Sequence, residues 1–309
     1  MAPRSDSRLK LLLYEPGWGR SSMPAEGTAD YEILEDPSRL REAHAVIFHI
    51  PTAPDLRRVR KYPGQKWVAW SFESDINYPM LRFAPYMAQF DLTMTYRLDS
   101  DVPLVHFGPE TRDSLRDPPR EKTAEAPAVY FASNAYDRSG RLQYVEELMR
   151  FLPIDSFGKS LKNRELPDDR GRETKLATIG RYRFNIAFEN SLTQDYVTEK
   201  FFDPLLAGCV PVYRGAPNIA EFAPGENCFI DAAAFDGPRE LAEYLHWLTG
   251  NPAEYAKYLE WKRQPSLQPG FLEKLALTSP DCLERLCIKL RAMGCGRPGG
   301  RSLWRRWFP

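Results

Sequence analysis

The apolar positions of the first third of the chain fall in short runs separated by charged, Pro-rich and Gly-rich stretches. Runs of this length, rich in β-branched and aromatic residues and bounded by turn residues, are typical of buried strands. A short helical stretch is expected between them at residues 38–42. The predicted strands cover residues 8–15 (RLKLLLYE), 45–50 (AVIFHI), 66–72 (KWVAWSF), 91–97 (DLTMTYR) and 103–107.

Residues 110–127 (ETRDSLRDPPREKTAEAP) are charged and Pro-rich and contain few apolar positions. A stretch of this kind indicates a solvated linker or surface loop. We therefore place a domain boundary here and expect three parts, namely an N-terminal domain at 1–120, a C-terminal domain at 121–296 and a tail at 297–309.

A second series of alternating strands and helices follows the linker. Strands alternating with helices indicate a parallel α/β sheet. The fold class expected from two such series is α/β, with two Rossmann-like domains facing across a cleft. The predicted strands are 128–132, 184–188, 210–213 and 227–231, and the predicted helices are 140–151, 197–207, 238–248, 253–261 and 279–293.

Charge and cysteine content narrow the classes of protein. Lys and Arg together number 42 and so do Asp and Glu, which argues against a nucleic-acid-binding protein because those usually carry a basic excess. The five cysteines include no CxxC pair and favour a reducing cytosol. The apolar run Leu11–Leu13 is too short for a signal peptide or a membrane anchor, so we expect a cytoplasmic enzyme of the bacterial type.

Three segments in order carry a recognisable signature. They are 70–74 (WSFES) with 90–101 (FDLTMTYRLDSD), 131–144 (FASNAYDRSGRLQY) and 184–215 (FNIAFENSLTQDYVTEKFFDPLLAGCVPVYRG). Together they resemble the α1,3/α1,4-fucosyltransferases, which form glycosyltransferase family 10. One departure is Asp75, which stands where many members of the family have proline.

The resemblance implies that the two Rossmann-like domains have the GT-B arrangement. It also implies an inverting transferase that moves L-fucose from GDP-fucose to the 3- or 4-hydroxyl of an N-acetylglucosamine unit. The acceptor would be a glycan of the N-acetyllactosamine or lacto-N-biose type, giving Lewis-type products, and would be held by the N-terminal domain. The C-terminal domain would hold GDP-fucose. Two alternatives stay open, namely a transferase of the same fold that uses another nucleotide sugar, and a non-catalytic glycan-binding protein.

The proposed base is Glu73, which follows an apolar strand. A single carboxylate is sufficient for inversion by direct displacement, because it only has to take the proton from the acceptor hydroxyl. The resemblance assigns the same role to the Glu of the FES motif. We expect the segments 17–30 and 75–83 to determine acceptor choice.

The expected donor site lies in the second half of the chain. Arg141 and Lys200 are predicted to clamp the diphosphate, because a guanidinium fork and an ammonium both suit phosphate oxygens. Arg138 is the rival of Arg141, but Arg141 directly precedes the predicted helical residues, as the family pattern requires. The other candidates are Asn190, which offers an amide, Tyr196, Glu199, Asn134, and Glu189 as an orienting partner.

No metal or cofactor is expected to be required, because a cationic clamp can stabilise the leaving group. The Asp99-Ser100-Asp101 sequence is interpreted as a structural loop, and stimulation by Mn²⁺ or Mg²⁺ stays open. Residues 297–309 (RPGGRSLWRRWFP) combine arginines with aromatic residues, a pattern that suits an anionic membrane surface. The hypothesis is peripheral attachment to the inner membrane through this tail, and the alternative is a disordered soluble tail.

Overall fold

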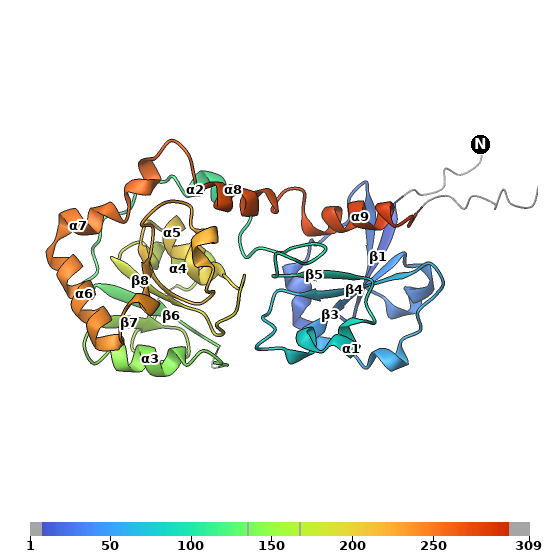
Figure 1. The fold of residues 1–309 in the computed structure, drawn as a ribbon, viewed down its shortest axis with the longest axis horizontal. Helices are drawn as coiled ribbons and strands as arrows, with labels where there is room; N and C mark the ends of the chain where they lie inside the picture. The colour runs from blue at the N-terminus through green and yellow to red at the C-terminus, as the bar shows by residue number, and fades with distance from the viewer. Residues whose placement is uncertain (1–7, 135, 167, 297–309) are drawn as a thin grey trace, which may run out of the picture. The chain divides into compact units, whose positions relative to one another are not determined.

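The computed structural model describes residues 8–134, 136–166 and 168–296. The chain divides into two compact units, one formed by residues up to Leu104 together with those from Pro280, and the other by Val105–Ser279. Each unit is built on its own five-stranded sheet (Figure 1). This confirms the predicted fold class, an α/β architecture with two parallel sheets.

The first unit has a parallel sheet with the strand order β2-β1-β3-β4-β5. Two apolar clusters cover its faces, with Leu11 and Leu13 in one and Leu12 in the other, because successive side chains of a strand point to opposite faces. The strands are β1 (Leu9–Tyr14), β2 (Tyr31–Leu34), β3 (Ala45–His49), β4 (Lys66–Ser71) and β5 (Leu92–Thr95), and the helical segments include η1 (Gly17–Ser22), η2 (Pro37–Glu42), η5 (Pro79–Arg82) and α1 (Ala84–Met87).

The helix α9 (Cys282–Ala292) belongs to this first unit, although it lies near the end of the chain (Figure 1). Its buried face consists of Leu283, Leu286, Cys287 and Leu290, which pack in the same cluster as Leu11 and Leu13. The last helix of the expected C-terminal domain, 121–296, therefore packs with the first unit. Apolar residues at helical spacing predict the helix, but they do not reveal which sheet the helix covers.

The second unit repeats the parallel arrangement with the order β10-β9-β8-β6-β7. Helices cover both faces of this sheet, with α3 and α6 packed together on one face. The strands are β6 (Ala128–Phe131), β7 (Ile154–Phe157), β8 (Phe184–Phe188), β9 (Val210–Arg214) and β10 (Ile230–Asp231), and the helices are α2 (Thr111–Ser114), α3 (Arg141–Leu148), α4 (Arg172–Ile179), α5 (Glu199–Leu206), α6 (Pro238–Gly250), α7 (Pro252–Lys257) and α8 (Pro269–Ala276).

The strand predicted at 103–107 is wrong. Val102 and Leu104 each donate a backbone hydrogen bond to β5, but Pro103 between them has no N–H and the pairing goes no further. The predicted linker also contains α2 and belongs to the second unit. Within the residues that the structure describes, no helix is long and apolar enough to cross a membrane. The tail 297–309 lies outside those residues.

Candidate active site

The carboxyl end of β8 carries the centre of the candidate site. In parallel α/β sheets, ligands bind beyond the carboxyl ends of the strands. Glu189 and Asn190 directly follow β8, and the segment after them leads to the first turn of α5. The helix α5 begins one residue after Thr198, so the predicted start at Val197 is early by two residues.

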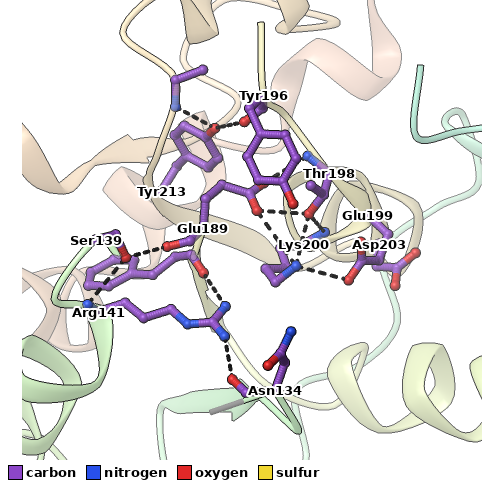
Figure 2. A network of polar contacts seen from close by, with 12 residues as sticks. Asn134, Ser139, Arg141, Glu189, Tyr196, Thr198, Glu199, Lys200, Asp203 and Tyr213 are labelled. Carbon is purple, nitrogen blue, oxygen red and sulfur yellow. Dashed lines mark hydrogen bonds and ion pairs between the residues drawn. The ribbon is translucent and has the colours of Figure 1, made fainter. Parts of the chain in front are cut away.

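Glu189 is fully buried and joins the strand end to the helix start. Its carboxylate accepts hydrogen bonds from the backbone N–H of Thr198 at 2.7 Å and from the Thr198 hydroxyl at 2.9 Å (Figure 2). The Lys200 ammonium lies 3.6 Å from the same carboxylate. Glu189 therefore fixes the first turn of α5, and its role as an orienting partner for the donor stays a prediction.

Lys200 lies between two carboxylates. Its Nζ is 3.2 Å from Oε1 of Glu199 and donates to the Thr198 hydroxyl at 3.0 Å. Burial opposes the charge on Lys200, but Glu199 and Glu189 outweigh it and raise the pKa of the ammonium. Lys200 therefore stays charged at neutral pH, in the first turn of a helix whose N-terminal amides also attract anions.

The two carboxylates differ in their electrostatic surroundings. Burial raises the pKa of Glu189, although Lys200 opposes the shift. Burial also opposes the charge on Glu199, but Lys200 and Lys175 together hold the pKa of this carboxyl well below its ordinary range. The Glu199 side chain is 44% exposed, so its carboxylate can still reach a ligand.

Arg141, at the start of α3, is only 1% exposed. Its guanidinium donates to the carbonyl oxygens of Asn134 at 2.8 Å and Phe188 at 3.3 Å (Figure 2). These contacts tie the carboxyl ends of β6 and β8 together, so in this structure Arg141 acts as a positioning group. Its predicted contact with a diphosphate stays a prediction. The rival Arg138 places its guanidinium over the Tyr136 ring, 5.3 Å from the ring centroid, in a cation–π contact.

The segment between β8 and α5 is held by paired side chains. Asp195, whose φ is 68°, and Asn218 exchange two hydrogen bonds of 2.9 Å each. This contact fixes the backbone beside Tyr196, whose ring is buried and packs edge-on against His106. Asn190 is also buried, and its Oδ1 has no hydrogen-bond partner within the part of the chain that the structure describes. A buried acceptor of this kind can take a hydrogen bond from a ligand.

A second group of charged residues, which the sequence reasoning missed, connects α5 to α4. Asp203 is 1% exposed in the middle of the helix, and its carboxylate pairs with Lys175 at 2.8 Å and with Arg172 at 3.0 Å. Lys175 also lies 4.0 Å from Glu199. The only signal in the sequence is an acidic residue that stands one helical turn after Glu199 among the apolar residues of the helix.

The start of α3 depends on another residue that the sequence reasoning did not select. The Asp137 carboxylate accepts hydrogen bonds from the backbone N–H groups of Ser139, Arg141 and Leu142 at 3.0–3.2 Å. The Ser139 hydroxyl in turn donates to the Glu189 carbonyl at 2.6 Å (Figure 2). The loop after β6 and the residues after β8 are therefore joined through hydrogen bonds.

Glu73 lies in the first unit, two residues after β4. The Ser71 hydroxyl accepts from its backbone N–H at 3.0 Å and donates to its carbonyl at 2.9 Å, which fixes the turn that carries the side chain. The structure therefore places Glu73 at the carboxyl end of the first sheet. The other seven candidates lie in the second unit, after β6 and β8 and at the starts of α3 and α5.

The Asp99-Ser100-Asp101 loop makes structural contacts. Asp101 accepts from the backbone N–H and the hydroxyl of Thr93 at 2.8 and 3.0 Å, and Asp99 pairs with Arg97 at 3.2 Å. Among the residues with described positions, no group of three or more His, Cys, Asp and Glu side chains is arranged to hold a metal ion.

Comparison with known families gives two successive matches along the chain. Residues 7–107 match the family description "Fucosyltransferase, N-terminal", and residues 120–294 match "Glycosyltransferase family 10 (fucosyltransferase) C-term". The chain belongs to glycosyltransferase family 10. The predicted family is thereby confirmed, over a match that includes every candidate residue.

Individual relatives were found by sequence and by structure. A fucosyltransferase-like protein of Arabidopsis thaliana is 39% identical over 231 residues, which cover 74% of this chain and 44% of that protein. The GDP-fucose protein O-fucosyltransferase 3 of Gallus gallus is 37% identical over 281 residues, covering 84% of this chain and 59% of that protein. The chain spans about half the length of the curated relatives it matches.

A crystal structure of an α1,3-fucosyltransferase with GDP has the same fold. It aligns with a TM-score of 0.64 and 17% identity, over 97% of this chain and 95% of that chain. At this level of identity the likeness concerns the fold.

Proposed function

We propose that this chain is an inverting transferase that moves L-fucose from GDP-fucose to a hydroxyl group of an acceptor. The observation that carries the proposal is the cluster of Glu189, Lys200 and Glu199 around the first turn of α5. Departure of a nucleoside diphosphate requires positive charge near its phosphates. Lys200 supplies that charge, and it is held in place by hydrogen bonds and ion pairs before any ligand binds.

The other donor-side residues receive matching roles. The exposed part of the Glu199 carboxylate can accept hydrogen bonds from ribose or fucose hydroxyls and can balance the positive charge that develops at the anomeric carbon. The buried Asn190 amide offers an acceptor to the donor. Asn134 and Tyr196 complete the set, and Arg141 keeps the ends of β6 and β8 in register for phosphate binding.

Glu73 is the proposed base that takes the proton from the acceptor hydroxyl. Its backbone is fixed by Ser71, so its carboxylate starts from a defined point at the end of β4. Direct displacement at the anomeric carbon then forms the new C–O bond as the bond to the diphosphate breaks. The proton moves to Glu73, and GDP leaves.

The acceptor has two candidates. The motifs in the sequence suggest the 3- or 4-hydroxyl of an N-acetylglucosamine unit in a glycan. A second candidate is a hydroxyl group of a protein, which is favoured by the names of three vertebrate relatives, each a GDP-fucose protein O-fucosyltransferase 3 with 36–37% identity.

The test is product formation from GDP-fucose with N-acetyllactosamine, lacto-N-biose and a panel of folded protein acceptors, for the wild type and for Glu73→Gln. Loss of the base should lower turnover about 10²–10⁴-fold while GDP binding is unchanged. Glu121→Gln, a change at an exposed carboxylate in the other unit, is the control. If the protein bound GDP-mannose or a UDP-sugar but not GDP-fucose, the donor assignment would be wrong. Binding of a glycan without turnover of any donor would favour a non-catalytic protein.

Two further proposals concern conditions and location. We propose that catalysis requires no metal ion, because Lys200 and the amides of α5 can stabilise the leaving group.

We also propose a cytoplasmic protein that contacts the inner membrane through residues 297–309. The five cysteines, all free thiols, support a reducing compartment. Co-sedimentation with anionic vesicles, with and without residues 297–309, tests the second proposal, and equal binding by both forms would contradict it.

A further inference from the structure

Large apolar side chains are exposed at specific loops of the first unit. Apart from Ile288 on α9 and Met293 directly after it, the large apolar side chains that the described residues of this unit expose are Trp18, Met80 and Phe83, at 53%, 42% and 54%. Trp18 lies in the segment that follows β1, and the other two lie in the segment that follows β4 and Glu73. These are segments at the carboxyl end of the sheet, where α/β proteins bind ligands.

One side of the Trp18 ring is fixed by a contact with a buried ring, although half of the Trp18 surface is exposed. Its ring packs edge-on against the buried His49 ring, with the centroids 4.4 Å apart and the planes at 89°. The His49 ring lies 4.7 Å from the ring of Trp70 on β4, three residues before Glu73. Two ring contacts therefore connect Trp18 to the strand that leads to the proposed base.

The backbone around Trp18 is fitted to this contact. A Cβ at Gly19 would lie 2.7 Å from the His49 ring, so only glycine lets the segment approach so closely. Gly17, on the other side, has a φ of 55°, which side chains other than glycine rarely adopt. The Thr52 hydroxyl contacts both the Pro16 carbonyl, at 3.2 Å, and Nδ1 of His49, at 2.9 Å.

The His49 ring that packs against Trp18 is neutral at physiological pH. Burial lowers the pKa of His49 to about 4. Trp18 therefore presents a large, rigid and apolar face to solvent, with an indole N–H as its polar group. This chemistry matches a pyranose ring, which has one face of C–H groups and hydroxyls at its edge. Glu15, an exposed carboxylate three residues before Trp18, offers an acceptor for sugar hydroxyls.

We propose that Trp18 is the platform on which a pyranose ring of the acceptor glycan stacks, and that His49 and Gly19 position it. The inference rests on the proposed function and commits it to a glycan acceptor. It makes Trp18 a determinant of acceptor affinity that has no part in binding the donor.

The experiment compares the wild type with Trp18→Ala and Trp18→Phe in two assays. The first is steady-state transfer from GDP-fucose to N-acetyllactosamine and lacto-N-biose. The second is calorimetric binding of these oligosaccharides in the presence of GDP, which needs no turnover. Trp247→Ala is the matched control, because Trp247 is a tryptophan of similar exposure (47%) on α6 of the other unit, stacked on Tyr244.

We expect Trp18→Ala to raise the acceptor KM and the oligosaccharide Kd about 10-fold or more, as for aromatic anchors at interfaces. The KM for GDP-fucose and its slow hydrolysis without acceptor should stay unchanged. Trp18→Phe should keep part of the affinity, and Trp247→Ala all of it. If Trp18→Ala instead lowered kcat about 10-fold and left the acceptor KM unchanged, Trp18 would have a structural role and the inference would be wrong.

The remaining outcomes separate this inference from the proposed function. If GDP-fucose is hydrolysed and transferred, but oligosaccharides bind Trp18→Ala as well as the wild type, the platform is wrong and the transferase stands. If only proteins are fucosylated, the commitment to a pyranose is wrong. If GDP-fucose does not bind while oligosaccharide binding depends on Trp18, the donor assignment fails and the platform stands.

Discussion

Replacing Thr198 with valine would remove one hydroxyl from the centre of the buried cluster while nearly preserving the side-chain volume. In the wild type this hydroxyl donates to Glu189 at 2.9 Å and accepts from Nζ of Lys200 at 3.0 Å. It also caps α5 by accepting from the backbone N–H of Lys200 at 3.4 Å. The substitution thus separates the hydrogen bonds of the cluster from its packing.

The magnitude follows from two losses. Removal of an N-cap hydroxyl costs about 1 kcal/mol. An oxygen of the fully buried Glu189 carboxylate also loses a donor, and an unsatisfied buried group costs about 1–3 kcal/mol. Thr198→Val should therefore lower the free energy of unfolding of the second unit by about 2–4 kcal/mol. Because Lys200 loses a contact as well, GDP affinity should fall too.

The assay is urea unfolding combined with calorimetric titration of GDP, for Thr198→Val and for Thr198→Ser as the control that keeps the hydroxyl. A double-mutant cycle with Glu189→Gln measures the coupling, and the second substitution should cost less in the presence of the first. A valine variant as stable as the wild type, or effects that simply add, would show that the hydroxyl does not hold the cluster together.

Three other expectations are accessible to simple measurements. His49, one of four histidines, should titrate near pH 4 by NMR. Because the pKa of His49 is lowered in the folded protein, its contribution to the free energy of unfolding is complete above the ordinary histidine pKa. That contribution is lost, by about 3 kcal/mol, as the pH falls from about 6.5 through 4. Lys175→Met should destabilise the second unit by about 2 kcal/mol, because the buried Asp203 carboxylate loses a partner. Lys257→Met, which removes the exposed pair with Glu254, should cost less than about 1 kcal/mol. Equal effects of the two substitutions on the free energy of unfolding would contradict this expectation. Fucose transfer should persist after treatment with EDTA, and a complete loss that Mn²⁺ restores would refute metal independence.

The strands that the sequence predicted well are the apolar ones. The strand predicted at 184–188 has the observed bounds of β8, because all five of its residues are buried and the run has sharp ends. By contrast, β2 (YEIL) and β7 (IDSF) are four residues long and contain a charged residue each, so their patterns resemble loops. Short strands of this kind form because their neighbours in the sheet pair with them, and that pairing is not visible locally.

The candidate site was predictable where a motif marks it and not where only tertiary contacts do. Glu189, Glu199 and Lys200 belong to a recognisable signature, so their proximity at one strand end and one helix start could be expected. Lys175 and Asp203 come from separate helices and have no common motif. Their ion pair depends on how α4 packs against α5, which residue spacing within either helix does not reveal.

The charges around α5 explain how the proposed donor site can be stable before the donor arrives. Three carboxylates, those of Glu189, Glu199 and Asp203, contact three cations, those of Lys200, Lys175 and Arg172. Because opposite charges alternate, the cluster holds together without a ligand, whereas three cations alone would repel one another. In the proposed reaction, an arriving diphosphate meets an ammonium that is already in position. Preorganisation of this kind lets electrostatic stabilisation act in the transition state without first rearranging the protein.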